Sequence, residues 1–323
     1  MLIWIIDEEW KDYDMEKAIL EAKYPGVTIK VSNYNYASDL QAFGHKADGI
    51  LAQVYAPLPA STIKQLECCK GIAVYGGGYD RVDVQAAREK GISVTNISGY
   101  CAEDLADYVV AAMYFANKRI SQYNDTVVED CRHNRWGAMA VPRIGNRLST
   151  QTLCVLGFGV IGKTVAARAK ALGINVIAID DFVPVEAIEA LGVKKVSWEE
   201  GFTQADYVSI HLKGCDENKD KVNAHYLSLM KPTAWLINTA RGKIVDENAL
   251  IAAVKAHQIE GAILDVIKTE PPTGEEAILH CPGIYVTPHI SYISVESFRA
   301  LKERALENLQ NMLEGKTPRD LVN

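Results

Sequence analysis

Three polar residues in the second half of the chain, Arg241, Glu270 and His289, each follow an apolar run that suits a buried strand. These runs are Ala234–Asn238, Ala262–Val266 and Ile284–Val286. An arginine can grip a carboxylate through two hydrogen bonds. A histidine beside a carboxylate is favoured in its protonated form and can donate a proton near neutral pH. Together these residue types suit hydride transfer to a keto acid, which needs a carboxylate anchor and a proton donor.

Each of the three residues also has an ordinary interpretation. Arg241 could be a surface residue at a strand end, Glu270 a solvated acid in a proline-rich loop, and His289 a polar loop residue. Spacing alone therefore does not establish a site. The pair His280-Cys281 lacks the spacing of metal ligands, so we expect no metal.

The stretch from Thr152 to Asp180 has the pattern of a dinucleotide-binding unit. An apolar run leads into G-x-G-x-x-G (Gly157, Gly159 and Gly162), an amphipathic segment follows, and a second apolar run ends at Asp180. The glycines allow a tight turn, a close approach to a pyrophosphate and close helix packing, and the helix N-terminus suits phosphates. Asp180 can accept both ribose hydroxyls and would repel a 2′-phosphate, so we expect NAD(H) rather than NADP(H).

We expect cofactor contacts along this motif and just past the ends of neighbouring strands, where open α/β sheets place ligands. The expected cofactor-binding residues are Gly157, Phe158, Gly159, Val160, Ile161, Gly162, Asp180, His211, Thr239, Ala240, Arg241, Asp265 and His289.

Composition excludes several classes of protein. The 323 residues are enough for two domains, and 48% hydrophobic with 23% charged residues indicates a globular chain. The net charge is −7 and no basic cluster is present, so the sequence offers no positively charged surface for the phosphate backbone of nucleic acid. No apolar run approaches a membrane span, and the N-terminus lacks the features of a secretory leader. The seven cysteines are scattered without C-x-x-C, typical of reduced thiols, so we expect a cytoplasmic protein.

Residues 1–99 alternate short apolar runs with helical patterns, which predicts a five-stranded, doubly wound parallel sheet. No glycine motif follows Ile6, so we expect no dinucleotide there. The predicted strands are Leu2–Ile6, Thr28–Val31, Gly49–Val54, Ile72–Tyr75 and Ile92–Thr95, and the helical patterns are Met15–Tyr24, Ala60–Cys68 and Val82–Lys90.

A second α/β alternation surrounds the glycine motif. It adds a strand at Tyr207–Leu212 and helices at Asn223–Met230 and Glu247–His257. A helix over Cys101–Lys118 links the two alternations, and the more polar residues 119–150 are consistent with an extended arm. A last amphipathic helix over Val295–Glu314 is expected to return to the first domain, which leaves the nucleotide domain as an insertion.

Four motifs resemble those of the D-2-hydroxyacid dehydrogenase family. They are Tyr75–Asp83 (YGGGYDRVD), Leu236–Leu250 (LINTARGKIVDENAL), Ile263–Pro272 (ILDVIKTEPP) and Tyr285–Ser291 (YVTPHIS). The resemblance runs in consistent order from about residue 45 to the C-terminus. It implies two doubly wound parallel-sheet α/β domains: a flavodoxin-like substrate domain (1–101 and 291–323), split by an inserted Rossmann NAD-binding domain (102–290).

The resemblance also implies the chemistry. Arg241 would bind the carboxylate and keto oxygen of the substrate, His289 would be the acid–base residue, and Glu270 would pair with it. The reaction would interconvert a small 2-keto acid and a D-2-hydroxy acid with NAD. The expected substrate-binding residues are Tyr55, Tyr75, Gly76, Gly77, Gly78, Arg241 and His289. A homodimer is implied through the region of the arm at about 119–150, with Trp136 entering the partner's cleft.

The sequence departs from the family pattern at one position, and it also resembles a second class of protein. Lys213 stands where the family usually has proline, close to the expected cofactor cleft. The glycine loop and Gly99–Tyr108 also resemble C-terminal binding proteins, which are corepressors, so an NAD(H) sensor with little turnover is the alternative. We favour the enzyme because all three catalytic positions are retained. Tyr55, Tyr75 and Tyr100, expected in loops near the pocket, hint at a substrate with a modest or apolar side chain.

Overall fold

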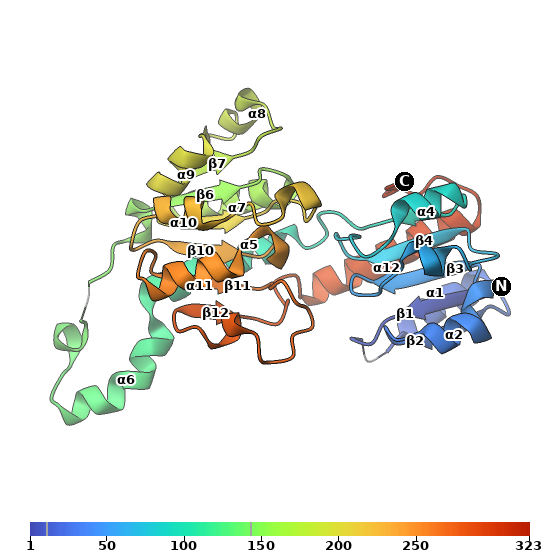
Figure 1. Cartoon of the computed structure of the whole chain (residues 1–323), viewed down its shortest axis with the longest axis horizontal. Coiled ribbons are helices and arrows are strands. Elements are labelled where there is room, and N and C mark those ends of the chain that lie inside the picture. The colour runs from blue at the N-terminus through green and yellow to red at the C-terminus, as the bar shows by residue number, and fades with distance from the viewer. Residues whose placement is uncertain (11, 143) are drawn as a thin grey trace. The chain divides into compact units, whose positions relative to one another are not determined.

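The chain forms two compact units in a computed structural model that describes residues 1–10, 12–142 and 144–323 (Figure 1). Unit 1 comprises Met1–Tyr100 and Ser294–Asn323, and unit 2 comprises Cys101–Ile293. Each unit contains one parallel sheet with helices on both faces, so the predicted fold class is confirmed. Residues 101 and 291–293, which the sequence analysis assigned to the substrate domain, belong to unit 2.

Unit 1 has a five-stranded parallel sheet in the order β2-β1-β3-β4-β5, the order of flavodoxin-like folds. Its strands are β1 Leu2–Ile6, β2 Thr28–Ser32, β3 Gly49–Gln53, β4 Gly71–Tyr75 and β5 Ser93–Thr95. Its helices are α1 Asp14–Lys23, α2 Ala37–Ala42, α3 Ala60–Ile63, α4 Val84–Glu89 and α12 Val295–Leu313, with a short 3-10 helix η1 at Gly44–Lys46. The helix predicted over Ala60–Cys68 is therefore a single turn, and α2 was not predicted.

Alternate side chains of β1, β3 and β4 are buried on opposite faces of the sheet of unit 1. On β1, Trp4 and Ile6 join the core beneath α2, α3 and α4. Ile3 and Ile5 join the core beneath α1 and α12. The return of α12 to unit 1, expected from its apolar spacing, is therefore correct.

Unit 2 has a seven-stranded parallel sheet in the order β12-β11-β10-β9-β6-β7-β8. The chain order reverses between β6 and β9, and such a switch point is where open α/β sheets bind ligands. The strands are β6 Thr152–Leu156, β7 Asn175–Ile179, β8 Lys194–Lys195, β9 Tyr207–Ile210, β10 Trp235–Asn238, β11 Gly261–Leu264 and β12 Ile284–Val286.

Helices of unit 2 cover both faces of this sheet. One core includes side chains of α5, α7 and α8, and the other includes those of α9, α10 and α11. The helices are α5 Ala102–Lys118, α6 Ile120–Arg132, α7 Val160–Ala171, α8 Val185–Glu189, α9 Trp198–Gln204, α10 Ala224–Leu229 and α11 Glu247–Lys255. Short 3-10 helices are η2 Gly137–Ala140, η3 Leu148–Thr150, η4 Asp216–Asn218, η5 Gly242–Ile244 and η6 Ala277–His280.

The arm contains a helix that the sequence analysis did not predict. Arg119, with φ of 51°, ends α5 and lets the chain start α6 in a new direction. Figure 1 shows α6 projecting from the sheet of unit 2. Its apolar residues Ile120, Tyr123, Val127 and Cys131 recur at helical spacing, a signal that the polar composition of the segment concealed.

Candidate active site

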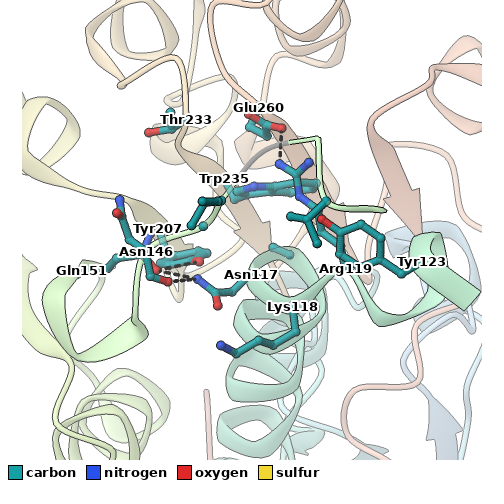
Figure 2. Close-up of a pocket in the computed structure, with 14 residues that line it drawn as sticks. Asn117, Lys118, Arg119, Tyr123, Asn146, Gln151, Tyr207, Thr233, Trp235 and Glu260 are labelled. Atoms are coloured by element: carbon teal, nitrogen blue, oxygen red, sulfur yellow. Dashed lines mark hydrogen bonds and ion pairs between the residues drawn. The ribbon is translucent and has the colours of Figure 1, made fainter. Parts of the chain in front are cut away.

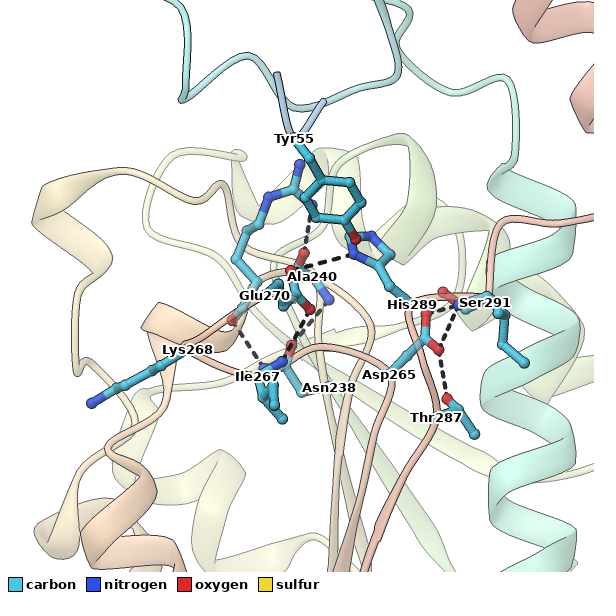
Figure 3. A network of polar contacts seen from close by, with 12 residues as sticks. Tyr55, Asn238, Ala240, Asp265, Ile267, Lys268, Glu270, Thr287, His289 and Ser291 are labelled. Atoms are coloured by element: carbon cyan, nitrogen blue, oxygen red, sulfur yellow. Dashed lines mark hydrogen bonds and ion pairs between the residues drawn. The ribbon is translucent and has the colours of Figure 1, made fainter. Parts of the chain in front are cut away.

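The three predicted catalytic residues lie on loops that follow three neighbouring strands of unit 2. Asn238 of β10 pairs with Leu264 of β11, which pairs with Val286 of β12, so the carboxyl ends of these parallel strands share one edge. The following loops carry Arg241, Glu270 and His289, and Figure 3 shows the close approach of the last two. Residues separated by up to 48 positions are brought together because βα crossovers return each strand to the same direction.

His289 and Glu270 form the central pair. His289 Nδ1 lies 3.4 Å from Glu270 Oε2, and the two side chains are only 17% and 16% exposed. The other oxygen, Glu270 Oε1, accepts the backbone N–H of Ile267 at 3.2 Å, which holds the carboxylate in its loop. A carboxylate at this distance can hold the imidazole ring in one orientation. The interpretation of Glu270 as a solvated loop residue is therefore wrong.

Arg241 follows β10 in a loop ordered by its neighbours. The side chain of Asn238 accepts the N–H of Ala240 and donates to the carbonyl of Arg241, both at 3.0 Å. Gly242 must be glycine, because a Cβ there would lie 1.9 Å from the backbone of Ile267 in the loop that carries Glu270. This close approach fixes the arginine and glutamate loops against each other.

Asp265 orders the segment that carries the histidine. Its side chain is fully buried and accepts the hydroxyl of Thr287 at 2.5 Å and the N–H groups of Ile290 and Ser291 at 2.9 and 2.8 Å (Figure 3). The sequence analysis placed Asp265 among the cofactor-binding residues. In the structure its carboxylate holds the histidine segment, and a cofactor contact of Asp265 stays a prediction.

The glycine turn after β6 fits a dinucleotide. A Cβ on Gly162 would lie 2.1 Å from the carbonyl oxygen of Gly157, so only glycine lets α7 pack this closely on the strand. Gly157 has φ of +97°, and a Cβ there would meet the backbone of His211. Beside Gly159 no atom lies within 4 Å of a Cβ position, which leaves room for a pyrophosphate against the backbone.

Asp180 lies at the end of β7, beside this turn. Its carboxylate accepts N–H groups of Phe158 at 2.7 Å, Phe182 at 2.9 Å and Val183 at 2.8 Å. Burial acts to raise the pKa of Asp180, but these three N–H groups outweigh it and the pKa lies below its ordinary value. Asp180 is therefore an anion beside the glycine turn.

His211 and Thr239 follow β9 and β10 at the same edge. Burial lowers the pKa of His211 to about 3, so its imidazole is neutral, and Nε2 lies 2.8 Å from Ser209 Oγ. Thr239 is also buried. Within the part of the chain that the structure describes, neither His211 Nδ1 nor Thr239 Oγ1 has a hydrogen-bond partner.

Comparison with known proteins identifies the family. Residues 110–291 match the model of the D-isomer specific 2-hydroxyacid dehydrogenase, NAD binding domain. The chain belongs to this family. It is 33% identical to the glyoxylate reductase of Korarchaeum cryptofilum over 85% of this chain and 82% of that one. It is 35% identical to the glycerate dehydrogenase of Methylorubrum extorquens, over 82% of each chain.

The solved structure of a related enzyme has the same fold. The structure of D-lactate dehydrogenase from Aquifex aeolicus, complexed with NAD and lactic acid, superposes with a TM-score of 0.85 at 25% identity and covers 99% of this chain and 98% of that chain. This dehydrogenase family confirms the predicted enzyme class, an oxidoreductase, and the NAD cofactor.

Of the substrate-binding residues expected in unit 1 of this dehydrogenase, Tyr55 and the glycines follow strand ends, whereas Tyr75 lies within a strand. Tyr55 follows β3, and the loop Gly76–Gly78 follows β4, where φ of +146° at Gly76 requires glycine. The expectation that Tyr75 lies in a loop is wrong. Tyr75 is the last residue of β4, its side chain is 1% exposed, and its hydroxyl donates to Glu16 at 3.0 Å. Tyr100 lies in a turn and packs on the same core.

A separate pocket of about 260 Å³ lies at the opposite edge of the sheet in unit 2 (Figure 2). Tyr207 and Trp235, the first residues of β9 and β10, form part of its wall. Arg119 and Glu260 form an ion pair of 2.7 Å at its rim. It lies at the amino ends of these strands, whereas Arg241 and His289 follow carboxyl ends, so it is not part of the candidate active site.

Among residues 1–10, 12–142 and 144–323, no three His, Cys, Asp or Glu side chains are grouped as metal ligands. No helix in the described part of the chain is long and apolar enough to cross a membrane.

Proposed function

We propose that this enzyme reduces a small 2-keto acid to the D-2-hydroxy acid with NADH, and catalyses the reverse reaction, with His289, Glu270 and Arg241 as its catalytic residues. The observation that carries the proposal is the His289–Glu270 pair, 3.4 Å apart at the strand edge that also bears Arg241. Bound NADH supplies the hydride.

Each catalytic residue has one task. Arg241 binds the substrate carboxylate through charge-assisted hydrogen bonds and orients the keto group. Protonated His289 donates its proton to the keto oxygen as negative charge develops there. Glu270 stabilises the imidazolium and orients the ring. In oxidation, neutral His289 accepts the hydroxyl proton.

The cofactor site is proposed along the turn Gly157–Gly162, with Asp180 at the ribose and the loops at His211 and Thr239–Ala240 beside it. The open space beside Gly159 and the negative charge of Asp180 support this assignment. Asp180 disfavours a 2′-phosphate, so NAD(H) is preferred over NADP(H).

The substrate carboxylate is proposed to reach amides of Gly77 and Gly78, with Tyr55 beside the substrate side chain. This assignment follows the family resemblance. A glyoxylate or hydroxypyruvate-like substrate is a natural first test, because glyoxylate reductases and a glycerate dehydrogenase are among the relatives.

A cytoplasmic homodimer through the arm completes the proposal. The arm exposes large apolar side chains: Ile120 is 72%, Val128 60%, Trp136 70%, Met139 69% and Ile144 89% exposed. Such a concentration of apolar surface is typical of a surface that another protein chain covers. Trp136 is proposed to reach the partner's cleft.

The test is the pH dependence of kcat/KM in both directions, with a panel of keto acids from glyoxylate to phenylpyruvate. Reduction should fall as pH rises and oxidation should climb over the same range. Glu270→Gln keeps the shape of the side chain but removes its charge, so both profiles should move to lower pH. His289→Ala should nearly abolish both directions while NADH still binds.

Two results would overturn the proposal. Unshifted profiles in Glu270→Gln would remove Glu270 as the partner of the histidine. Tight NADH binding by the wild type without turnover of any keto acid in the panel would favour the sensor.

A further inference from the structure

A chain of hydroxyl groups leads from α5 to the segment that carries His289. The hydroxyl of Tyr108, on α5, lies 2.6 Å from Thr287 Oγ1, and Thr287 Oγ1 lies 2.5 Å from Asp265 Oδ1. Tyr108 is separated from Thr287 by 179 positions, so no local sequence pattern predicts this hydrogen bond. The sequence analysis gave no function to either residue.

The direction of the hydrogen bonds follows from counting protons. Asp265 as a carboxylate only accepts, so the single hydroxyl proton of Thr287 points to it. Tyr108 must then donate to Thr287. Burial raises the pKa of Tyr108, with the charge of Asp265 adding to the rise, so the phenol keeps its proton at neutral pH.

This series of hydrogen bonds ends at the backbone of His289, whose conformation must be stabilised by its neighbours. His289 has φ of +55°, a left-handed conformation that is unfavourable for a residue with a side chain. The N–H of His289 is held by the carbonyl of Asp265 at 3.0 Å, and the next two N–H groups are held by its carboxylate. Successive N–H groups around one anion form a nest, and the nest fixes the direction of the imidazole.

We propose that Tyr108 is a positioning residue for His289, acting through Thr287 and Asp265. The proposal rests on the proposed role of His289 as the acid–base residue. Tyr108 contacts neither substrate nor cofactor in this scheme. Its hydroxyl fixes Thr287, Thr287 fixes the carboxylate of Asp265, and that carboxylate holds the backbone of 289–291.

The test uses two substitutions that remove a hydroxyl and keep the shape, Tyr108→Phe and Thr287→Val. Each should lower kcat for keto-acid reduction roughly 10-fold, because a small misplacement of the proton donor slows proton transfer. The KM for the keto acid and the Kd for NADH should stay nearly unchanged. Thr287→Ser keeps the hydroxyl and should retain activity close to the wild type. The double variant should be no slower than either single variant, because the two changes break the same chain.

A measurement without turnover complements the kinetics. Hydrogen exchange of the amides of residues 289–291 should be faster in Tyr108→Phe than in the wild type, with no cofactor added. Tyr114→Phe is the matched control, since Tyr114 lies on the same helix and is 38% exposed, and it should change neither exchange nor kcat.

A His289→Ala background separates this proposal from the proposed function. If His289→Ala is inactive, adding Tyr108→Phe should cause no further loss. If His289→Ala is fully active, the proposed acid–base role of His289 is wrong, and the proposed positioning role of Tyr108 is then wrong as well. If His289→Ala is inactive but Tyr108→Phe and Thr287→Val keep wild-type kcat and exchange, only the positioning role is overturned.

Discussion

Each sheet contains a strand–helix–strand unit, β1-α1-β2 in unit 1 and β6-α7-β7 in unit 2, but the turn after the first strand differs between them. In unit 1, β1 ends at Ile6 and α1 begins only at Asp14. The intervening Asp7 is 3% exposed and accepts the N–H groups of Glu9 and Trp10 and the hydroxyl of Tyr13, at 3.0, 3.1 and 2.7 Å. The chain thus supplies its own anion to the turn.

In unit 2 the turn between β6 and α7 is short and rich in glycine. Gly157–Gly159 separate Leu156 from Val160, and the acid stands at the end of the second strand, as Asp180. The first N–H groups of α7 have no acceptor within the helix, so an external anion can use them. The two turns therefore differ in where the carboxylate comes from: Asp7 lies within the turn of unit 1, whereas in unit 2 the turn N–H of Phe158 is accepted by Asp180, which follows the second strand.

The largest expected effect comes from putting a side chain into the turn of unit 2. Gly162→Ala places a Cβ 2.1 Å from a backbone oxygen that cannot give way, so unit 2 should lose stability and NADH affinity should fall roughly 100-fold or more. Fluorescence titration with NADH measures the affinity. Hydrogen exchange should show the loss of protection in unit 2 and not in unit 1.

Gly159→Ala is the matched variant that separates folding from binding. No atom lies within 4 Å of its Cβ position, so this variant should fold as the wild type does. Its methyl group occupies the space beside the backbone, so NADH should still bind more weakly. Wild-type NADH affinity in both glycine variants would refute the proposed cofactor site.

A smaller effect is expected from Asp180→Ala. This change removes three backbone hydrogen bonds and the negative charge beside the ribose position. NADH affinity should fall roughly 10-fold, or about 1.4 kcal/mol, and the preference for NADH over NADPH should narrow. The ratio of kcat/KM for the two cofactors is the measurement. An unchanged ratio would mean that Asp180 does not select against the 2′-phosphate.

The counterpart in unit 1 should affect stability alone. Asp7→Asn weakens the acceptor for two N–H groups and the hydroxyl of Tyr13, so the free energy of unfolding of unit 1 should fall by about 1–3 kcal/mol. NADH affinity should not change. Urea denaturation gives the first quantity and NADH titration the second, and Asp12→Asn, outside these contacts to Asp7, serves as control. A loss of NADH binding in Asp7→Asn would break the comparison.

Much of the fold was predictable because it depends on local patterns. All predicted strands exist within about two residues, since buried parallel strands are short apolar runs bounded by turn residues. The missed helices α2, α8 and α9 have five to seven residues each, which is less than two full turns. The helix α6 was missed because its apolar stripe is exposed and its surroundings are polar.

The candidate site was predictable where a sequence motif alone suggests the role of a residue. It was less predictable where the role depends on hydrogen bonds to residues far away in the sequence. Motifs indicated Arg241, Glu270 and His289. The hydrogen bonds of Asp265 and the burial of Tyr75 depend on tertiary packing, so the sequence did not predict these hydrogen bonds and placed Tyr75 in a loop. Tyr108 was invisible for the same reason, because its partner lies 179 residues away.

The smallest expected effect concerns alkaline pH, where the two units should again differ. Burial is the largest cause that raises the pKa of Tyr13 and Tyr75 in unit 1, and the carboxylates of Asp7 and Glu16 raise these pKa values further. Among the described residues, five tyrosines of unit 1 have raised pKa values, whereas three do in unit 2: Tyr13, Tyr24, Tyr34, Tyr36 and Tyr75 against Tyr108, Tyr207 and Tyr226.

A phenol whose pKa is higher in the folded than in the unfolded state stabilises the fold fully below the unfolded pKa of 10.0 and loses that contribution as pH rises above it. Unit 1 should therefore open before unit 2 as the pH rises above about 10. Limited proteolysis with a protease active at this pH, with fragments identified by mass spectrometry, follows each unit separately. Tyr13→Phe should lower the stability of unit 1 at neutral pH, because Asp7 loses a donor, but should make its decline with pH less steep. Earlier cleavage in unit 2, or an equally steep decline in Tyr13→Phe, would show that the internal anion of unit 1 does not control its response to pH.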